Sequence, residues 1–231
     1  MEVVLFYNQV KQIGIPFMEK RNIFEELKLA IMRGVYKPRE RLVERELAEH
    51  FSVSRTPIRE AIRKLESIGM VRISPNQGAK VADFSVEDVN ALFAVRIYLE
   101  KFAVNLACAG NSDKVKEEIK ALSNLNQNLI FAVSSDDFAR IVEFDQKFHL
   151  VLLGCSRNPY LMHVIEELRL KSYPISYYLW KSKANVQTSL SEHKKMVKAL
   201  QRRDATELSS IIEKQLNNAK DSYLKYLNRQ I

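Results

Sequence analysis

Arginines recur at every fourth position within one short segment of the chain, residues 53–65. Arg55, Arg59 and Arg63 therefore share one side of a helix, while apolar residues recur at spacings of three and four on another side. A guanidinium group donates two parallel hydrogen bonds to a guanine edge and also pairs with phosphate. We expect this helix to read the major groove of double-stranded DNA. Its apolar side consists of Ile58, Ala61, Ile62 and Leu65.

A second group of polar residues interrupts apolar stripes in the C-terminal half of the chain. Asp145 and His149 are four residues apart, so one helix would present both on the same side, and His193 interrupts the stripe of a later helix. A carboxylate and two imidazoles form a common ligand set for a divalent metal ion. The alternative is a group of core side chains that hydrogen-bond to one another, which is the commoner role of a single buried histidine. The spacing leaves both possibilities open.

Two further polar residues fall in the same kind of position. Arg96 lies inside the apolar stripe of a helix predicted to begin at Ser85, and Glu100 lies at the edge of that stripe. Gln215 interrupts the stripe of the last predicted helix. Buried charges and amides need partners, so we expect these side chains to satisfy one another or a bound ligand.

The arginine helix must be positioned by its neighbours in the chain. The periodicity predicts helices over residues 22–33 and 44–51, and the short connection 52–54 leads from the second of these into the arginine helix. Two short helices joined in this way, the second of them basic, form a helix-turn-helix. Ser54 or Thr56 can cap the start of the arginine helix with a hydroxyl group.

A β-hairpin is predicted immediately after this helix. Residues 70–74 alternate apolar and polar side chains, residues 75–78 have turn composition, and a second short strand follows. Such a hairpin is the wing of a winged helix-turn-helix, and its tip presents Gln77 and Gly78 to DNA. A winged helix that binds another protein is the alternative. The regular spacing of the arginines favours DNA.

From Ser85 onward the pattern is helical, without a convincing strand. Helix starts are predicted at Ser85, Ser134 and Asp204, where a capping oxygen is followed three residues later by an acid, and at Asn158-Pro159. We expect a bundle of about six helices in this half. The predicted fold class is mainly α, with an N-terminal winged helix-turn-helix domain and a C-terminal all-α helical bundle.

Composition bounds the kind of protein. The net charge of +8 suits a polyanionic partner, and 231 residues with 46% hydrophobic side chains can bury the cores of two domains. Cys108 and Cys155 suggest no disulfide framework, and no signal peptide or run of about 18 apolar residues occurs. We therefore expect a cytoplasmic protein with no membrane partner. The predicted parts are an N-terminal arm at residues 1–21, the winged domain at 22–84 and the bundle at 85–231.

Residues 41–48 (RLVERELA), 53–66 (VSRTPIREAIRKLE), 69–71 (GMV) and 78–81 (GAKV) resemble the winged domain of GntR-type bacterial transcription regulators. The resemblance covers this domain nearly residue by residue. It implies contacts with operator bases and phosphates by Arg45, Arg55 and Arg59, phosphate contacts by Ser54 and Thr56, and a wing tip at Gly78.

Residues 144–149 (FDQKFH), 158–161 (NPYL) and 192–193 (EH) resemble the FCD ligand-sensing domain found in the FadR-type branch of the GntR family. Many members of that branch bind a divalent metal ion there through an aspartate and three histidines. The resemblance assigns three of these ligands to Asp145, His149 and His193, and it puts Gln215 where the fourth histidine stands. An amide oxygen is a poorer ligand than imidazole for zinc or nickel. The departure leaves open which metal binds, zinc, nickel or manganese, and whether the site is occupied.

Arg96 resembles the arginine that opens the Arg-x-x-x-Glu stretch of the FCD domain. A guanidinium group suits a carboxylate, so we expect a small carboxylate metabolite to bind between Arg96 and the metal ion. The sequence thus predicts a ligand-responsive transcription regulator, a repressor that binds a palindromic operator as a homodimer. The alternatives are an architectural DNA-binding protein without an effector and a metal-dependent enzyme. The absence of a general base near Asp145 argues against the enzyme.

Overall fold

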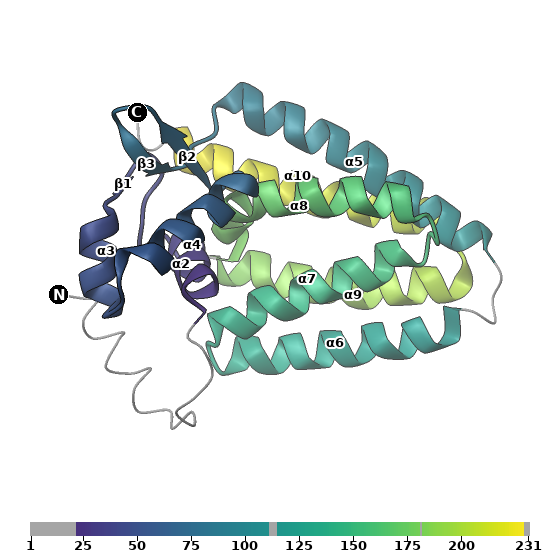
Figure 1. Cartoon of the computed structure of the whole chain (residues 1–231). Helices are drawn as coiled ribbons and strands as arrows, with labels where there is room; N and C mark the ends of the chain where they lie inside the picture. The colour runs from purple at the N-terminus through teal and green to yellow at the C-terminus, as the bar shows by residue number, and fades with distance from the viewer. Residues whose placement is uncertain (1–21, 111–114, 181, 229–231) are drawn as a thin grey trace. The chain divides into compact units, whose positions relative to one another are not determined.

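The computed structural model describes residues 22–110, 115–180 and 182–228 of the chain. The chain divides into two compact units, Met1–Asp83 and Phe84–Ile231. Helices dominate both units, so the predicted mainly α fold class is confirmed (Figure 1). The arm predicted over residues 1–21 lies outside the described residues.

In the described part of the first unit, three helices form the core. They are α2 (Ile23–Met32), α3 (Glu44–Phe51) and α4 (Arg55–Ser67). Helices α2 and α3 both pack against α4, whose apolar side is buried as predicted. Fully burying one isoleucine or leucine contributes roughly 1.5–3 kcal/mol to the stability of the fold. The buried side chains of Ile58, Ile62 and Leu65 therefore hold the apolar side of α4 against the core. The arginine side of α4 is therefore left to solvent.

A three-stranded antiparallel sheet completes this unit. Its strands are β1 (Arg41–Leu42), β2 (Val71–Ser74) and β3 (Gly78–Val81), in the order β1-β3-β2. Ser74 pairs with Gly78, so residues 74–78 form the tip of the β2–β3 hairpin. Gly69 lies just after α4 and has a φ of 75°. Glycine adopts this left-handed conformation without strain, and it is a common way to end a helix. The predicted winged helix-turn-helix fold is confirmed.

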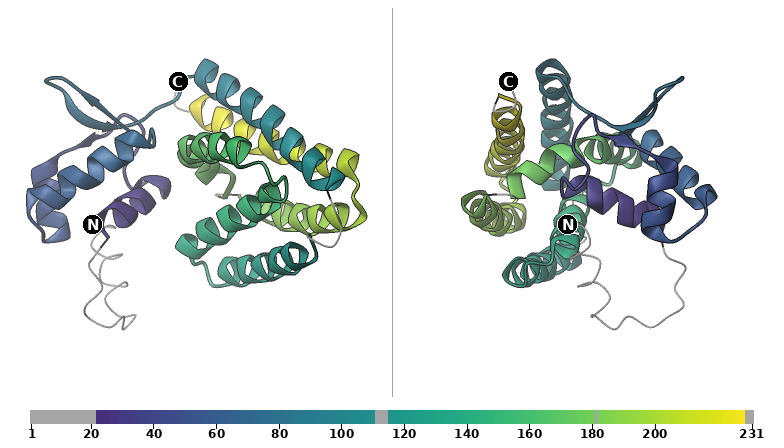
Figure 2. Two further views of the ribbon diagram at one scale, coloured as in Figure 1. Left: turned by 45° about the vertical axis from the view of Figure 1, so that its right-hand side comes forward. Right: turned by 90° about the vertical axis from the view of Figure 1, so that its left-hand side faces the viewer.

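The described part of the second unit contains six helices. They are α5 (Val86–Ala109), α6 (Lys116–Ser134), α7 (Phe138–Gly154), α8 (Pro159–Trp180), α9 (Lys183–Arg202) and α10 (Ala205–Asn228). The first and last of them, α5 and α10, lie side by side along the bundle (Figures 1 and 2). Helix α10 also packs against α8 and α9, and α6 packs against α7 and α9. The bundle thus brings helices from both ends of the domain to one core.

Local capping signals account for most of the helix starts in the bundle. The Ser85 side chain accepts from the backbone of Asp88, and the Asp88 carboxylate accepts from the backbone of Ser85, which forms a complete capping box. Asn158 caps α8 by accepting from the Leu161 N–H at 3.1 Å. Asp204 caps α10 in the same way, at 2.9 Å from the Glu207 N–H.

The helix start predicted at Ser134 is wrong. Ser134 is the last residue of α6, and α7 begins after Asp137, whose carboxylate accepts from the Arg140 N–H. Asp136 between them has φ 53°, a left-handed conformation that ends the first helix. Serine followed by aspartate suits a helix end as well as a helix start, so the local signal placed the boundary three residues early.

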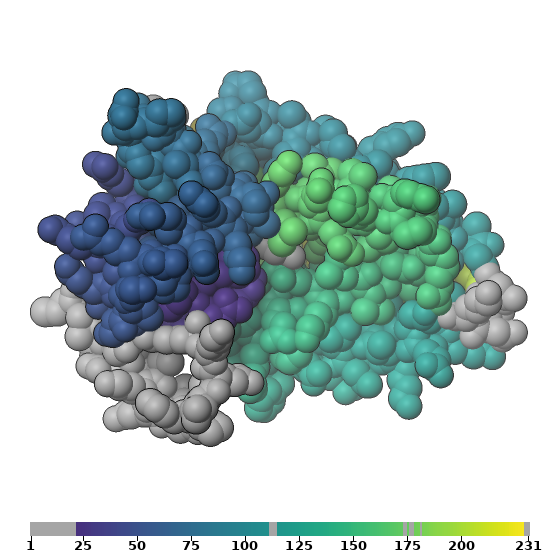
Figure 3. Space-filling view, viewed as in Figure 1, coloured from purple at the N-terminus to yellow at the C-terminus, as the bar shows by residue number. Residues whose placement is uncertain are grey.

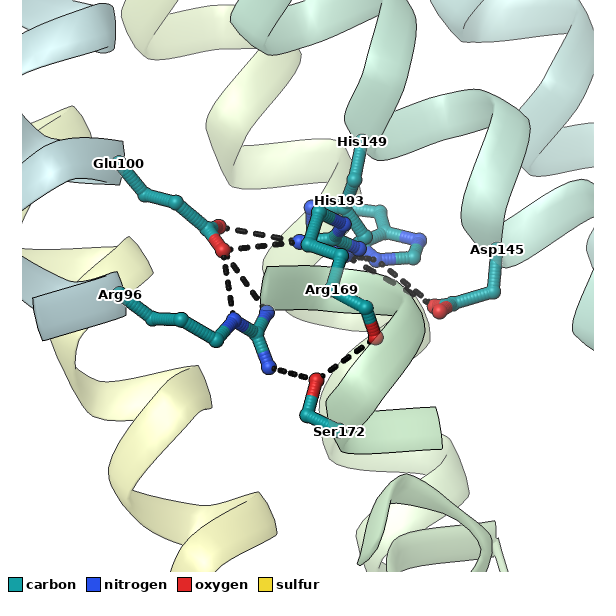
Figure 4. Close-up of polar contacts among 7 residues, drawn as sticks. All are labelled: Arg96, Glu100, Asp145, His149, Arg169, Ser172 and His193. Carbon is teal, nitrogen blue, oxygen red and sulfur yellow. Dashed lines mark hydrogen bonds and ion pairs between the residues drawn. The ribbon is translucent and has the colours of Figure 1, made fainter. Parts of the chain in front are cut away.

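The core of the bundle is apolar, with Phe93, Phe148 and Tyr223 almost completely buried. No described helix combines the length and the apolarity that crossing a membrane requires. Polar side chains from α5, α7, α8 and α9 nevertheless meet within the bundle (Figure 4). These buried polar side chains form the second of the two sites described next.

Candidate functional site

The geometry of the helix-turn-helix depends on a three-residue connection between α3 and α4. Ser52 adopts a left-handed conformation (φ 55°) and ends α3, and the Val53 N–H returns to the carbonyl of Ala48. Ser54 then takes an extended conformation immediately before α4. This tight reversal sets α4 at a fixed angle to α3 while the apolar back of α4 stays buried.

All seven residues predicted to contact DNA lie on the exposed surface of the first unit. Arg45 is on α3, and Gln77 and Gly78 are at the hairpin tip. The other four lie at the start and in the second turn of α4: Ser54, Arg55, Thr56 and Arg59. The start of α4 also carries the positive end of the helix dipole, which favours phosphate.

The prediction that a hydroxyl group of Ser54 or Thr56 caps α4 is wrong. Ser54 occupies the N-cap position, but its side chain makes no capping hydrogen bond, and Thr56 lies inside the helix. Pro57 in the first turn has no N–H to satisfy, which reduces the need for a cap. The Ser54 hydroxyl is exposed and is not engaged in capping.

Arg59 forms a forked ion pair that the sequence did not suggest. Its Nε donates to Glu44 Oε1 at 3.0 Å, and its Nη2 donates to Glu44 Oε2 at 2.8 Å. The hydrogen bond from Arg59 lowers the pKa of Glu44, and the charges of Arg55 and Arg63 lower it further. Arg45 has a much looser partner, since its Nε lies 3.9 Å from Glu49 Oε1. Glu44 therefore lies among the arginines of the predicted DNA-binding surface.

Two cationic side chains lie beside the hairpin tip, Lys80 of β3 and Arg41 of β1. Lys80 Nζ donates to Gln77 Oε1 at 3.0 Å. The guanidinium of Arg41 lies against Gly78, since a Cβ built on that glycine would be 3.6 Å from Arg41 Nε and Nη2. Gly78 has φ 75°, which favours glycine at this position. The wing thus adds positive charge to the surface formed by α3 and α4.

Within the bundle, Asp145 and His149 of α7 meet His193 of α9. The two histidine Nε2 atoms are 3.3 Å apart, and Asp145 Oδ1 lies 3.8 Å from His149 Nε2 and 3.6 Å from His193 Nε2. Phe148 stacks on the His193 ring with centroids 4.0 Å apart, which holds the orientation of that ring. The structure therefore brings together the three residues that the sequence singled out.

Burial controls the charges of these three groups. It raises the pKa of Asp145 to about 6, although the charges of Arg169 and Arg96 act in the opposite direction. Burial also lowers the pKa of His193 to about 3 and that of His149 well below its usual value, with Arg169 contributing to both. Both imidazoles are neutral at pH 7, which is the form that binds a metal ion.

The donor set fits a divalent cation. A point equidistant from three atoms separated by 3.3, 3.6 and 3.8 Å lies about 2.1 Å from each, which matches the usual zinc–nitrogen and zinc–oxygen distances. Among the described residues, neither His149 Nδ1 nor His193 Nδ1 has a hydrogen-bond partner. Both Nε2 atoms face the shared point, so the same geometry serves either a metal ion or a single His–His hydrogen bond. Two imidazoles and one carboxylate suit zinc, nickel or manganese.

Arg96, the predicted effector residue, belongs to a buried ionic network. Its Nε and Nη2 donate to Glu100 Oε1 at 3.1 and 2.8 Å, and its Nη1 donates to Ser172 Oγ at 2.7 Å. Arg169 Nη1 donates to both oxygens of Glu100, at 3.2 and 3.0 Å (Figure 4). Burial opposes ionisation of Glu100, but the two guanidinium groups lower its pKa, so the carboxylate is charged.

The sequence missed Arg169 and Ser172 of α8. Arg169 is buried, and its charge affects the pKa of every member of the Asp145, His149 and His193 cluster. A signal was available in the form of an arginine within a helix whose neighbouring positions are apolar. Its partner Glu100 lies 69 residues earlier, so no local spacing connects the two.

Gln215 of α10 is buried, as its place in an apolar stripe predicted. Its Nε2 donates to Ser189 Oγ of α9 at 3.0 Å. That bond fixes the amide nitrogen and leaves the amide oxygen as the atom that would act as a ligand. The assignment of Gln215 as a metal ligand remains a proposal.

Known proteins resemble the chain in both units. Residues 19–81 match the pattern of bacterial regulatory proteins of the gntR family, and residues 91–218 match the FCD domain. The chain belongs to the GntR family of regulators with an FCD domain. It is 29% identical over 182 residues to the uncharacterized HTH-type transcriptional regulator YdhC of Bacillus subtilis strain 168, covering 78% of this chain and 80% of that one.

McbR of Escherichia coli resembles this GntR-family chain both in sequence and in structure. The HTH-type transcriptional regulator McbR of strain K12 is 27% identical over 198 residues, which cover 85% of this chain and 86% of McbR. The solved structure of Escherichia coli McbR/YncC superposes with a TM-score of 0.70 at 25% identity, covering 88% of this chain and 96% of that one. The GntR-family chain is thus a transcription regulator with a DNA-binding helix-turn-helix and an effector-binding FCD domain, and it is not an enzyme.

Proposed function

We propose that this regulator is a ligand-responsive repressor that binds a palindromic operator as a homodimer in the bacterial cytoplasm. Arg45, Arg55 and Arg59 would contact bases and phosphates, and the hairpin tip would contact the backbone. One winged helix reads only a few base pairs, so two copies related by twofold symmetry would be needed for a specific site. The observation that carries the sensing part of the proposal is the buried cluster of Asp145, His149 and His193 (Figure 4).

An exposed apolar surface on the bundle supports the homodimer. Tyr98 and Phe102 of α5 are 76% and 46% exposed, and Tyr160 of the neighbouring α8 is 86% exposed. Helix α8 lies at the surface of the bundle on the side seen in Figure 3. Large aromatic residues exposed on two adjacent helices suit an interface with a second copy. We expect sedimentation equilibrium to give a dimer for the wild type and a monomer for Tyr98→Glu.

The proposed effector is a small carboxylate. Arg96 and Arg169 place two buried positive charges in the same core as Asp145, His149 and His193. A divalent metal ion on these three residues would supply a further positive charge and open coordination positions for a carboxylate oxygen. The effector must bind the DNA-competent and incompetent states of the protein with different affinity, because otherwise it could not shift their populations.

Metal binding is tested by isothermal titration of chelator-stripped protein with zinc, nickel and manganese chlorides. We expect saturable heat with one equivalent per chain and its loss in Asp145→Ala. The matched control is Glu143→Ala, which removes an exposed carboxylate from the same helix. Buffer-level heat with all three metals would overturn the metal site.

Sensing is tested by fluorescence anisotropy with a duplex selected by the wild-type protein from a randomised library. Lactate, malonate, succinate and citrate are added in turn to the metal-loaded protein. We expect at least one of them to change operator affinity in the wild type but not in His193→Ala. Unchanged affinity throughout this panel would favour the architectural DNA-binding protein.

A further inference from the structure

The forked pair of Glu44 and Arg59 joins the two helices of the helix-turn-helix. Glu44 is the first residue of α3, and Arg59 lies in the second turn of α4. Two hydrogen bonds of 3.0 and 2.8 Å, from two guanidinium nitrogens to two carboxylate oxygens, connect them. A bidentate pair fixes the plane of the guanidinium group as well as its position. Glu44 therefore limits the directions in which Arg59 can present its remaining donors.

The edge of Arg59 that Glu44 occupies matters for base recognition. A guanidinium group has one edge formed by Nε and one terminal nitrogen, and another edge formed by the two terminal nitrogens. Glu44 binds the edge formed by Nε and Nη2. The edge formed by Nη1 and Nη2 can still donate two hydrogen bonds to guanine O6 and N7. The side chain of Arg59 is 57% exposed, so this edge is accessible to a base.

Glu44 also has an electrostatic cost on such a surface. It lies close enough to Arg55, Arg59 and Arg63 for all three to lower its pKa, so it carries a negative charge at neutral pH. A carboxylate there repels phosphates and weakens binding to DNA of every sequence. A repulsive group of this kind improves discrimination when the correct base supplies a compensating contact.

We propose that Glu44 is a positioning residue for base recognition. It holds Arg59 so that the Nη1–Nη2 edge meets a guanine, and its charge suppresses binding to non-cognate DNA. This inference rests on the proposed function, in which Arg59 contacts a base of the operator.

The experiment uses the full-length protein and a randomised duplex DNA library, with sequencing of the bound fraction. The wild type defines a motif, and Arg59→Ala identifies the base pair that Arg59 reads, because preference for guanine is lost there. Glu44→Gln keeps the shape of the side chain and removes its charge. The matched control is Glu46→Gln, which removes one exposed charge from the same helix without altering the fork.

We expect Glu44→Gln to weaken the preference for guanine at the Arg59 base pair and to leave other positions of the motif unchanged. Affinity for a duplex lacking the motif should rise several-fold at low salt, by more than in Glu46→Gln. In the Glu44→Gln/Arg59→Ala double variant the guanine preference should equal that of Arg59→Ala alone. Thermal unfolding of all variants checks that each is folded.

Two results would overturn the inference, and they are distinguishable. If the wild type selects a motif and Glu44→Gln keeps the same guanine preference as Glu46→Gln, Glu44 does not position Arg59. If the wild type selects no motif, the proposed operator binding fails and the role of Glu44 fails with it.

Discussion

Arginine and glutamate form hydrogen-bonded ion pairs in both units of this regulator, but in opposite surroundings. In the first unit the side chains of Glu44 and Arg59 are 35% and 57% exposed. In the bundle those of Arg96 and Glu100 are 5% and 1% exposed. Water screens the exposed pair, so it adds little stability and its members are accessible to DNA. The buried pair has lost its hydration, and it is tolerated because each charge has a partner.

The same chemical pair therefore serves two purposes, and burial decides which. On the surface it orients a side chain for recognition. In the core it fixes the relative positions of α5 and α8, because Glu100 of α5 binds Arg169 of α8 as well as Arg96. Breaking the two pairs should consequently affect different properties of the protein.

The largest expected effect is on the stability of the bundle. Glu100→Ala leaves two buried guanidinium groups without their carboxylate, which should lower the free energy of unfolding by about 3–5 kcal/mol. Urea denaturation followed by circular dichroism measures this change. Glu44→Ala is the matched surface variant, and its unfolding midpoint should equal that of the wild type. Equal midpoints for both variants would remove the distinction between the two pairs.

Conservative arginine-to-lysine changes sharpen the comparison. Lysine cannot form two parallel hydrogen bonds, so Arg59→Lys should weaken binding to the selected motif about ten- to a hundredfold, with unchanged thermal unfolding. Arg169→Lys should instead lower the unfolding temperature and leave the affinity of the folded protein for the motif unaltered. Fluorescence anisotropy measures the DNA affinity of both variants, and calorimetry measures their unfolding temperatures. An Arg59→Lys variant with wild-type affinity would contradict it.

The metal site offers a gain-of-function test within the same core. Gln215→His replaces the amide by the imidazole expected for a fourth ligand, so zinc or nickel should bind more tightly than in the wild type. Titration with a competing chelator measures the ratio of the two dissociation constants. The variant Gln215→Leu should not tighten binding. Unchanged affinity in Gln215→His would show that this position does not face the metal.

The smallest expected effect is on DNA affinity, when Arg63, an exposed arginine of α4, is replaced. Arg63→Ala should weaken binding to motif and non-motif DNA alike. The slope of log affinity against log salt should fall by about 2 for the dimer, as expected for one phosphate contact per protomer. Measurements at four or more salt concentrations give the slope. A loss of base preference at one position would instead make Arg63 a base-reading residue.

Much of the fold could be predicted because its signals are local. The apolar spacing of Ile58, Ile62 and Leu65 predicted the buried face of α4, and the Ser85–Asp88 pair predicted the start of α5. Both depend on side chains one turn apart. The boundary near Ser134 was wrong because helix ends and helix starts share the same polar residues, and only the left-handed Asp136 separates them.

The candidate sites were predictable only in part. Asp145 and His149 share a helix, so their proximity could be inferred, and an inward position for His193 followed from its apolar neighbours. Arg169 was missed because its partner comes from a distant segment of the chain. Glu44 was missed for a related reason, since it lies 15 positions before Arg59 and the turn that brings the two together lies between them. Spacing predicts which side of a helix a residue occupies but not what that side meets.

The buried network of Arg96, Glu100 and Arg169 also constrains how this regulator can evolve. Losing one member leaves an uncompensated charge in the core, whereas replacing all three by apolar residues of similar size can be neutral or stabilising. The effects of these substitutions are therefore strongly non-additive. Single mutations at the three positions should be removed by selection, so the three residues should be inherited together or lost together. A descendant that senses a different ligand would be expected to change other residues of the core first.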